Sequence, residues 1–167
     1  RARELTRALT DLDFNEFPRK RRLNLCTYTT MTQYDETLKL PMAYAPREIR
    51  KIVGEVASQA GIKQLRIAET EKYAHVTYFF NGGEEKKYPG EERIMIPSPK
   101  DVATYDLKPE MSARPVTEAL VKYLREQDVG LVIANYANAD MVGHSGKFEA
   151  SVKACEVIDE CLGKVVD

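Results

Sequence analysis

The chain has 167 residues, with 25 Lys and Arg against 26 Asp and Glu, which leaves a formal net charge of -1. This length fits one domain of ordinary size, or a small domain with a piece of another. The balanced charge excludes a global attraction to nucleic acid or to an acidic membrane surface. No apolar run approaches the roughly 20 residues that a membrane helix needs. We therefore expect neither nucleic acid nor membrane among the partners.

The cysteines indicate the redox compartment of the protein, and the chain ends lead us to expect a segment of a longer one. Cys26, Cys155 and Cys161 form no CxxC pair, and such an odd, scattered set is typical of a reducing compartment. We expect a cytoplasmic location. The chain begins at Arg1 without an initiator Met, and it closes while an apolar helical pattern is still running. We therefore expect an internal segment of a longer protein.

The first part of the chain predicts little regular structure. Residues 1–9 have the spacing of a short amphipathic helix. The basic run 19–22 is expected to be a solvated turn, and a nucleic-acid or localisation patch stays as the alternative. Residues 23–28 alternate with period two, which predicts a strand. Pro41 and Pro46 bracket a connector, where we expect a domain boundary.

The remainder alternates between helix and strand patterns. The expected elements are a helix from Ile49 to Gly61 through Ile52, Val53 and Val56, strands over 64–68 and 75–80 with a hairpin turn at 81–83, a strand over 93–96, a helix capped by Ser112, a strand over 130–134 and a closing helix. The buried stripe of the closing helix is expected to be Phe148, Val152, Cys155, Ile158, Leu162 and Val165. This alternation predicts an α/β fold with a mainly parallel sheet and helices on both faces.

The unbroken apolar run 130–134 predicts a central strand that is buried on both faces. In such sheets, ligands gather beyond the carboxyl ends of the strands. Asp140 and His144 follow this run and are four positions apart, so both side chains can converge on one cation. An oxygen and a nitrogen ligand suit Mn²⁺ or Zn²⁺ better than Ca²⁺. An incidental surface pair stays open as the alternative, because a catalytic metal usually has at least three protein ligands.

A second candidate, Lys72, follows the predicted strand over 64–68. An ammonium there could meet a phosphate or a carboxylate as a point charge; the alternative is a solvated side chain beside Glu69 and Glu71. His75 is expected to be a structural, hydrogen-bonded histidine in the strand that follows. The sequence has no glycine-rich phosphate loop, nucleophile elbow or dinucleotide fingerprint.

Four stretches, residues 67–83, 97–100, 103–112 and 138–144, resemble in this order the cofactor-independent phosphoglycerate mutases of the alkaline-phosphatase superfamily. The resemblance implies a cytoplasmic enzyme of glycolysis and gluconeogenesis, expected to be monomeric at full length. Such an enzyme would interconvert 3-phosphoglycerate and 2-phosphoglycerate, small-molecule substrates, through a phosphoserine intermediate. Two Mn²⁺ ions are implied, with Mg²⁺, Zn²⁺ or Co²⁺ as substitutes. Residues 1–41 would be the tail of an inserted phosphotransferase domain, 42–46 the linker, and 47–167 the returning part of the phosphatase-like domain.

The same resemblance implies a role for four residues. Asp140 and His144 match two ligands of one metal, Lys72 matches a lysine that contacts the phosphoryl group, and Arg1 matches the last arginine of a substrate-binding motif. The serine nucleophile and the other metal ligands are not in this segment, so the segment alone is expected to be inactive. The alternatives are another metal-dependent phosphatase or phosphopentomutase of the superfamily, and a non-catalytic fragment.

Overall fold

The computed structural model describes residues 2–35, 37–46 and 49–167, and the chain divides into two compact units, Arg1–Glu48 and Ile49–Asp167. In the first unit, helix α1 spans Ala2–Thr10, close to the predicted helix. The predicted strand over 23–28 is wrong, because these residues form no regular structure. Period-two alternation yields a strand only beside a partner, and the pairing described in this unit is one isolated bridge, Thr30 to Met42.

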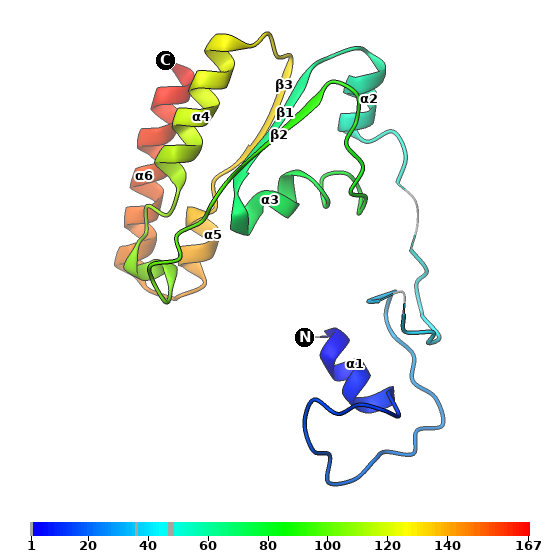
Figure 1. The fold of residues 1–167 in the computed structure, drawn as a ribbon. Coiled ribbons are helices and arrows are strands. Elements are labelled where there is room, and N and C mark those ends of the chain that lie inside the picture. The colour runs from blue at the N-terminus through cyan, green and yellow to red at the C-terminus, as the bar shows by residue number, and fades with distance from the viewer. Residues whose placement is uncertain (1, 36, 47–48) are drawn as a thin grey trace. The chain divides into compact units, whose positions relative to one another are not determined.

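The second unit is an α/β domain with a parallel sheet (Figure 1). Its elements are α2 (Val53–Gln59), β1 (Gln64–Glu69), α3 (Thr70–Val76), β2 (Glu91–Ile96), the 3-10 turn η1 (Tyr105–Leu107), α4 (Ala113–Glu126), β3 (Leu131–Asn135), α5 (Asn138–Gly143) and α6 (Phe148–Val166). The strand order is β2-β1-β3, and both pairings are parallel. The predicted fold class is confirmed.

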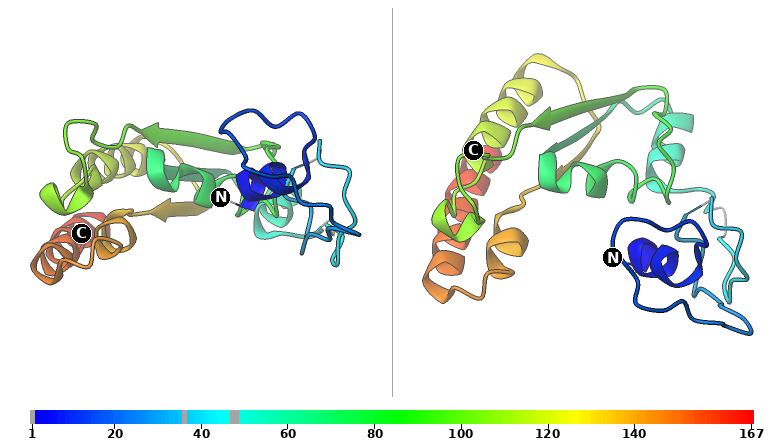
Figure 2. Two further views of the ribbon diagram at one scale, coloured as in Figure 1. Left: turned by 90° about the horizontal axis from the view of Figure 1, so that it is seen from below. Right: turned by 60° about the horizontal axis from the view of Figure 1, so that its bottom comes forward.

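Helices cover both faces of the sheet, as the views in Figures 1 and 2 show. On one face, Leu65 and Ile67 of β1 pack against Val116 and Leu120 of α4 and form the apolar core. Successive side chains of a strand point to opposite faces, so Gln64 and its period-two neighbours turn to the face that α2 and α3 contact. This part of the core therefore lies between β1 and α4, and further apolar clusters join α6 to α4 and to α5.

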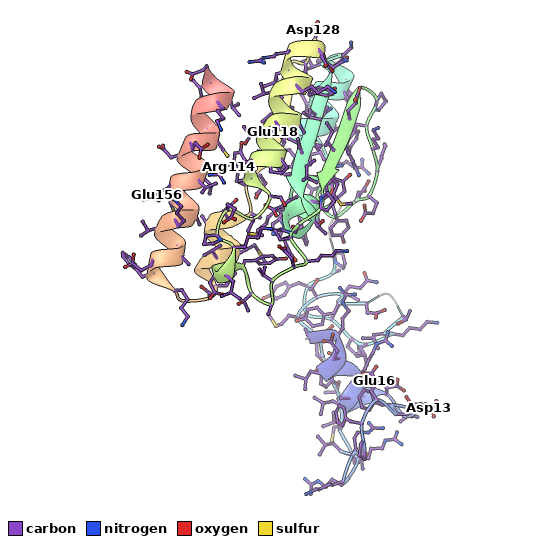
Figure 3. All side chains as sticks on the ribbon, turned by 60° about the vertical axis from the view of Figure 1, so that its left-hand side comes forward. Asp13, Glu16, Arg114, Glu118, Asp128 and Glu156 are labelled. Carbon is purple, nitrogen blue, oxygen red and sulfur yellow. The ribbon has the colours of Figure 1, made fainter. Side chains whose placement is uncertain are left out.

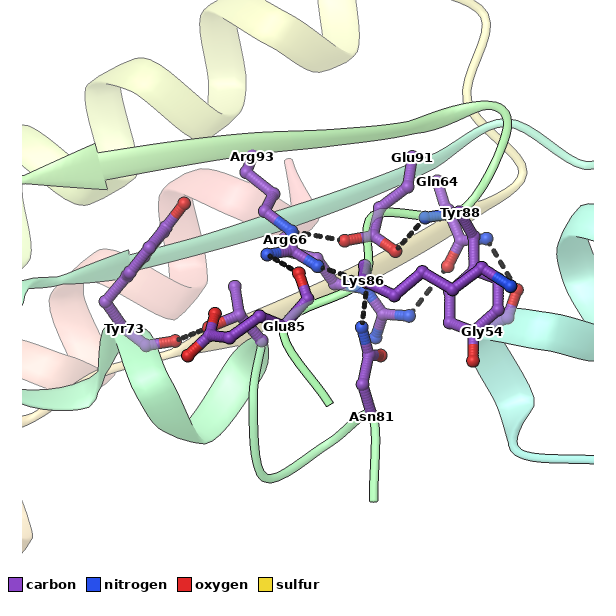
Figure 4. Close-up of polar contacts among 11 residues, drawn as sticks. Gly54, Gln64, Arg66, Tyr73, Asn81, Glu85, Lys86, Tyr88, Glu91 and Arg93 are labelled. Atoms are coloured by element: carbon purple, nitrogen blue, oxygen red, sulfur yellow. Dashed lines mark hydrogen bonds and ion pairs between the residues drawn. The ribbon is translucent and has the colours of Figure 1, made fainter. Parts of the chain in front are cut away.

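A buried polar cluster occupies the second face (Figure 4). Arg66 is fully buried, donates to Gln64 Oε1 at 2.7 Å and stacks on the ring of Phe80. Arg66 Nε and Nη1 have no protein partner in the described residues. Beside it, Arg93 donates to the carboxylate of Glu91, two residues earlier on β2. This face of the sheet is held by hydrogen bonds and ion pairs as well as by apolar contacts.

The prediction of a strand over 75–80 that ends in a hairpin is wrong. Residues 70–76 form α3 and residues 77–83 form turns, although the turn predicted at 81–83 does exist. The reason is topological. Since β1 and β2 are parallel, the segment between them must cross back to the starting edge of the sheet, which a hairpin cannot do.

Two burial predictions are also wrong. Strand β3 was predicted to be central and buried on both faces. It is half-buried and pairs only with β1 among the described strands, whereas β1 is buried throughout. In α6, the face turned to the protein is Ala154, Val157 and Cys161, while most of the predicted stripe, including Phe148, is exposed. Apolar residues lie on two faces of this helix, so periodicity alone could not choose between them.

Two helix starts differ from the prediction as well. The helix predicted from Ile49 begins at Val53, and Ile49 is exposed. Ser112 stands at the N-terminus of α4 as predicted, but it makes no side-chain cap; its hydroxyl donates to Pro97 O at 2.8 Å. The hydroxyl therefore ties α4 to the segment after β2 rather than to its own first turn.

Helices α4 and α6 run side by side and carry charges of both signs, among them Arg114, Glu118 and Glu156 (Figure 3). Arg114 of α4 pairs with Glu160 of α6 at 2.9 Å, and Lys164 pairs with the same carboxylate at 2.7 Å. The hydrogen bonds from these two cations lower the pKa of Glu160 to about 2. Within the described residues, none of the helices combines the length and apolarity needed to cross a bilayer.

Candidate metal and phosphate site

The candidate site lies at the edge of the sheet where β1 and β3 end. The two strands are parallel neighbours, with Ala68 paired to Asn135 at their carboxyl ends. Each strand leads into a short helix, α3 after β1 and α5 after β3. Helix α3 carries Lys72, and α5 carries Asp140. Parallel pairing therefore brings together two side chains that are 68 positions apart in the sequence.

Asp140 and His144 share one helical turn. Residues four apart on a helix lie on the same face, and His144, the residue after α5, keeps helical backbone angles and donates its N–H to Asp140 O at 3.1 Å. His144 Nε2 lies 3.3 Å from Asp140 Oδ1, and both side chains are accessible to solvent. The spacing in the sequence therefore produces a carboxylate and an imidazole that face one point in space.

Lys72 completes the cluster from the other helix. Its ammonium donates to Asp140 Oδ2, and its side chain is only 11% exposed, against 50% for Asp140. The hydrogen bond from the Lys72 ammonium lowers the pKa of Asp140 below its usual value. The Asp140 carboxylate is therefore ionised at neutral pH and lies between a cation and an imidazole.

The geometry of this pair fits a divalent cation. Two ligand atoms at about 2.1 Å from one ion lie about 3 Å apart when they subtend a right angle. The 3.3 Å between Asp140 Oδ1 and His144 Nε2 is close to that separation, and both groups are open to solvent. Across the described residues, no group of three or more His, Cys, Asp or Glu side chains forms a metal cage. Asp140 and His144 could therefore supply part of a coordination shell.

The remaining candidate residues have different outcomes. His75 was expected in a strand, but it lies exposed on α3, one turn after Lys72, with its ring 5.3 Å from that of Phe79. Arg1 lies outside the described residues. Sequence reasoning also assigned no role to Glu69, a fully buried carboxylate immediately before α3. The signal that could have identified it was an acidic residue closing an otherwise buried strand.

The chain matches the family model described as the metalloenzyme superfamily over residues 18–167. The 2,3-bisphosphoglycerate-independent phosphoglycerate mutase of Syntrophotalea carbinolica is 54% identical over 167 residues, which is 100% of this chain and 32% of the relative. A mutase so named from Methanosarcina barkeri is 56% identical over 165 residues, 99% of this chain and 32% of the relative. The resemblance found in the sequence is confirmed, and the chain spans about a third of the length of these relatives.

A solved structure is similar as well. A crystal structure of Leishmania mexicana phosphoglycerate mutase at low cobalt concentration matches with a TM-score of 0.73 and 34% identity. The match covers 97% of this chain and 30% of the other chain. Fold and sequence therefore point to the same group of proteins.

Proposed function

The chain belongs to the metalloenzyme superfamily, and on that premise we propose that it is a segment of a metal-dependent phosphoglycerate mutase. The whole enzyme would interconvert 3-phosphoglycerate and 2-phosphoglycerate through a phosphoserine intermediate. The observation that carries the proposal is the identity of 54% to 56%, over nearly the entire chain, with proteins of that name. The serine would lie in another part of the enzyme.

In this proposal, Asp140 and His144 hold one divalent ion. A bound ion supplies positive charge, which neutralises phosphoryl oxygens and lowers the pKa of an attacking hydroxyl. The anionic carboxylate and the imidazole nitrogen, 3.3 Å apart, are the donor types that Mn²⁺ accepts. We assign Mn²⁺ as the metal, and a second ion would be held by residues outside this chain.

Lys72 would bind the phosphoryl group of the substrate. Its ammonium is a compact point charge with three donors, and one of these engages Asp140. The other donors can contact phosphoryl oxygens at the same time. Phosphoryl transfer depends mainly on positioning and on stabilisation of charge, so a lysine held against the metal-binding carboxylate would place the substrate next to the ion. Arg1 is proposed as a further substrate contact.

The broader assignments complete the proposal. Residues 1–41 would be the tail of an inserted phosphotransferase domain, 42–46 the linker and 47–167 the returning part of the metal-binding domain. The full-length enzyme would be a cytoplasmic monomer that acts on small phosphorylated acids, without nucleic-acid or membrane partners. A piece without its serine nucleophile would be inactive.

The test uses the full-length protein that contains this chain. We expect Asp140→Asn and His144→Ala to remain folded, to bind less Mn²⁺ by metal analysis, and to lose at least about 100-fold in conversion of 3-phosphoglycerate. The control, Glu160→Gln, removes a half-exposed carboxylate of α6 that pairs with Arg114 and with Lys164. Full turnover and unchanged Mn²⁺ content in both site variants would refute the ligand assignment. Hydrolysis or pentose-phosphate isomerisation without mutase activity would refute the proposed reaction.

A further inference from the structure

A buried carboxylate marks the end of the central strand. Glu69 is fully buried, and burial raises the pKa of its carboxyl group. Its Oε2 accepts a hydrogen bond from Ser98 Oγ at 2.9 Å, and its Oε1 accepts one from the backbone N–H of Ser112 at 3.4 Å. The carboxylate therefore joins β1 to the segment after β2 and to the start of α4. Burial of a carboxyl group costs free energy, which its hydrogen bonds offset only in part. This cost indicates a role of Glu69 other than packing.

The Ser98 hydroxyl has a second partner in α3. It donates its one proton to Glu69 and accepts the backbone N–H of Glu71 at 3.3 Å. The backbone N–H of Ser98 in turn donates to Thr70 Oγ1 at 3.2 Å. Glu69 occupies the N-cap position of α3 but makes no side-chain cap of its own. The first turn of α3 is therefore capped by a serine from another segment of the chain.

This cap matters because α3 is short. The helix has seven residues, and isolated helices of that length are not stable in water. Lys72 is its third residue, and its ammonium reaches Asp140. Movement of the first turn would move the lysine. The Glu69–Ser98 pair anchors this turn, together with the Thr70 hydroxyl, which donates to Ile96 O of β2 at 3.4 Å.

We propose that Glu69 and Ser98 are positioning residues for Lys72: the Glu69 carboxylate orients the Ser98 hydroxyl, which caps α3 and holds the lysine against Asp140. Neither residue is proposed to contact substrate. The inference rests on the proposed function, because it assigns Lys72 a phosphoryl group to bind. It adds two residues that act through the lysine.

The first experiment is independent of activity. Amide hydrogen exchange is measured in the full-length protein for Ser98→Ala and for the control Ser58→Ala, which removes a hydroxyl that binds Pro89 O at the opposite end of β2. We expect exchange at Glu71 to become about fivefold faster in Ser98→Ala only, the usual effect of losing a helix cap. Glu69→Gln, which keeps the shape but loses the charge, should act in the same direction more weakly. Unchanged exchange at Glu71 in Ser98→Ala would overturn the proposal.

The second experiment asks whether the effect passes through Lys72. Ser98→Ala should lower kcat for 3-phosphoglycerate at least about tenfold with little change in KM, as expected for a displaced catalytic group. Placed in a Lys72→Met background, the same substitution should have no further effect. A tenfold loss that persists without the lysine would overturn the proposal. If the wild-type protein lacks mutase activity, the proposed function fails, while the exchange at Glu71 still decides whether Ser98 caps α3.

Discussion

Replacement of Lys72 by Met separates a functional ion pair from a structural one. Met keeps most of the apolar stem that lies in the protein and removes only the charge. Lys72 is nearly buried, but Asp140 is half exposed and returns to solvent when its partner is lost. For such a pair we expect the free energy of unfolding to fall by only about 1 kcal/mol, the upper end of the range for solvated ion pairs.

The effect on turnover should be much larger. If Lys72 stabilises charge on the transferring phosphoryl group, its loss should lower kcat by about 100-fold or more, which corresponds to about 2.7 kcal/mol of transition-state stabilisation. The measurements are formation of 2-phosphoglycerate by the full-length protein and urea unfolding of the same samples. Lys164→Met, which breaks the exposed pair with Glu160 on α6, is the matched control and should leave turnover unchanged. A loss of about 3 kcal/mol in stability with less than about a threefold change in turnover would refute the reasoning.

Three further results are expected. Gly54→Ala should lower the free energy of unfolding in urea by about 2 kcal/mol, because the added Cβ would lie 2.4 Å from Nη2 of the buried Arg66. The control Gly163→Ala, in open space within α6, should raise it by about 0.5 kcal/mol. Equal effects of the two substitutions would contradict the predicted clash with Arg66. Tyr105 donates to Glu71 at 2.7 Å, which raises its pKa to about 12. The folded state thus holds this proton more tightly than the unfolded one, so the stability advantage over Tyr105→Phe should be present below pH 10 and disappear between about pH 10 and 12. Chelation should abolish mutase activity of the full-length protein and added Mn²⁺ should restore it; full activity in the metal-free protein would argue against the assigned cofactor.

Several elements could be predicted because their signals are local. Periodicity and the turns that bound each segment predicted the helix after Ser112 and the strands over 64–68 and 93–96. The structure has them as α4, β1 and β2, with strand bounds that differ by one or two residues. The pairing of Asp140 with His144 has the same origin, since a helical turn places residues four apart on one face. The functional assignment came from motifs that the related mutases share, rather than from any single pair of residues.

Other predictions failed where long-range contacts decide. Residues 23–28 alternate like a strand, but no neighbouring strand pairs with them in the described chain. Residues 75–80 are rich in aromatic and branched side chains, yet parallel pairing of β1 with β2 requires a crossover there. The run 130–134 is as apolar as a central strand, but among the described strands it pairs with β1 alone. Composition records how apolar a segment is and not where in the sheet it lies.

The sequence by itself determined the mutase resemblance, the α/β class and the helical turn that pairs Asp140 with His144, because each depends on residues close together in the chain. Only the tertiary structure decided that β1 is the central strand, that Lys72 meets Asp140 across 68 positions, and that Ser98 caps α3. These contacts depend on which strands are neighbours and on which ends meet at the sheet edge. Strand order is a property of the whole packed domain, so no local pattern could reveal it.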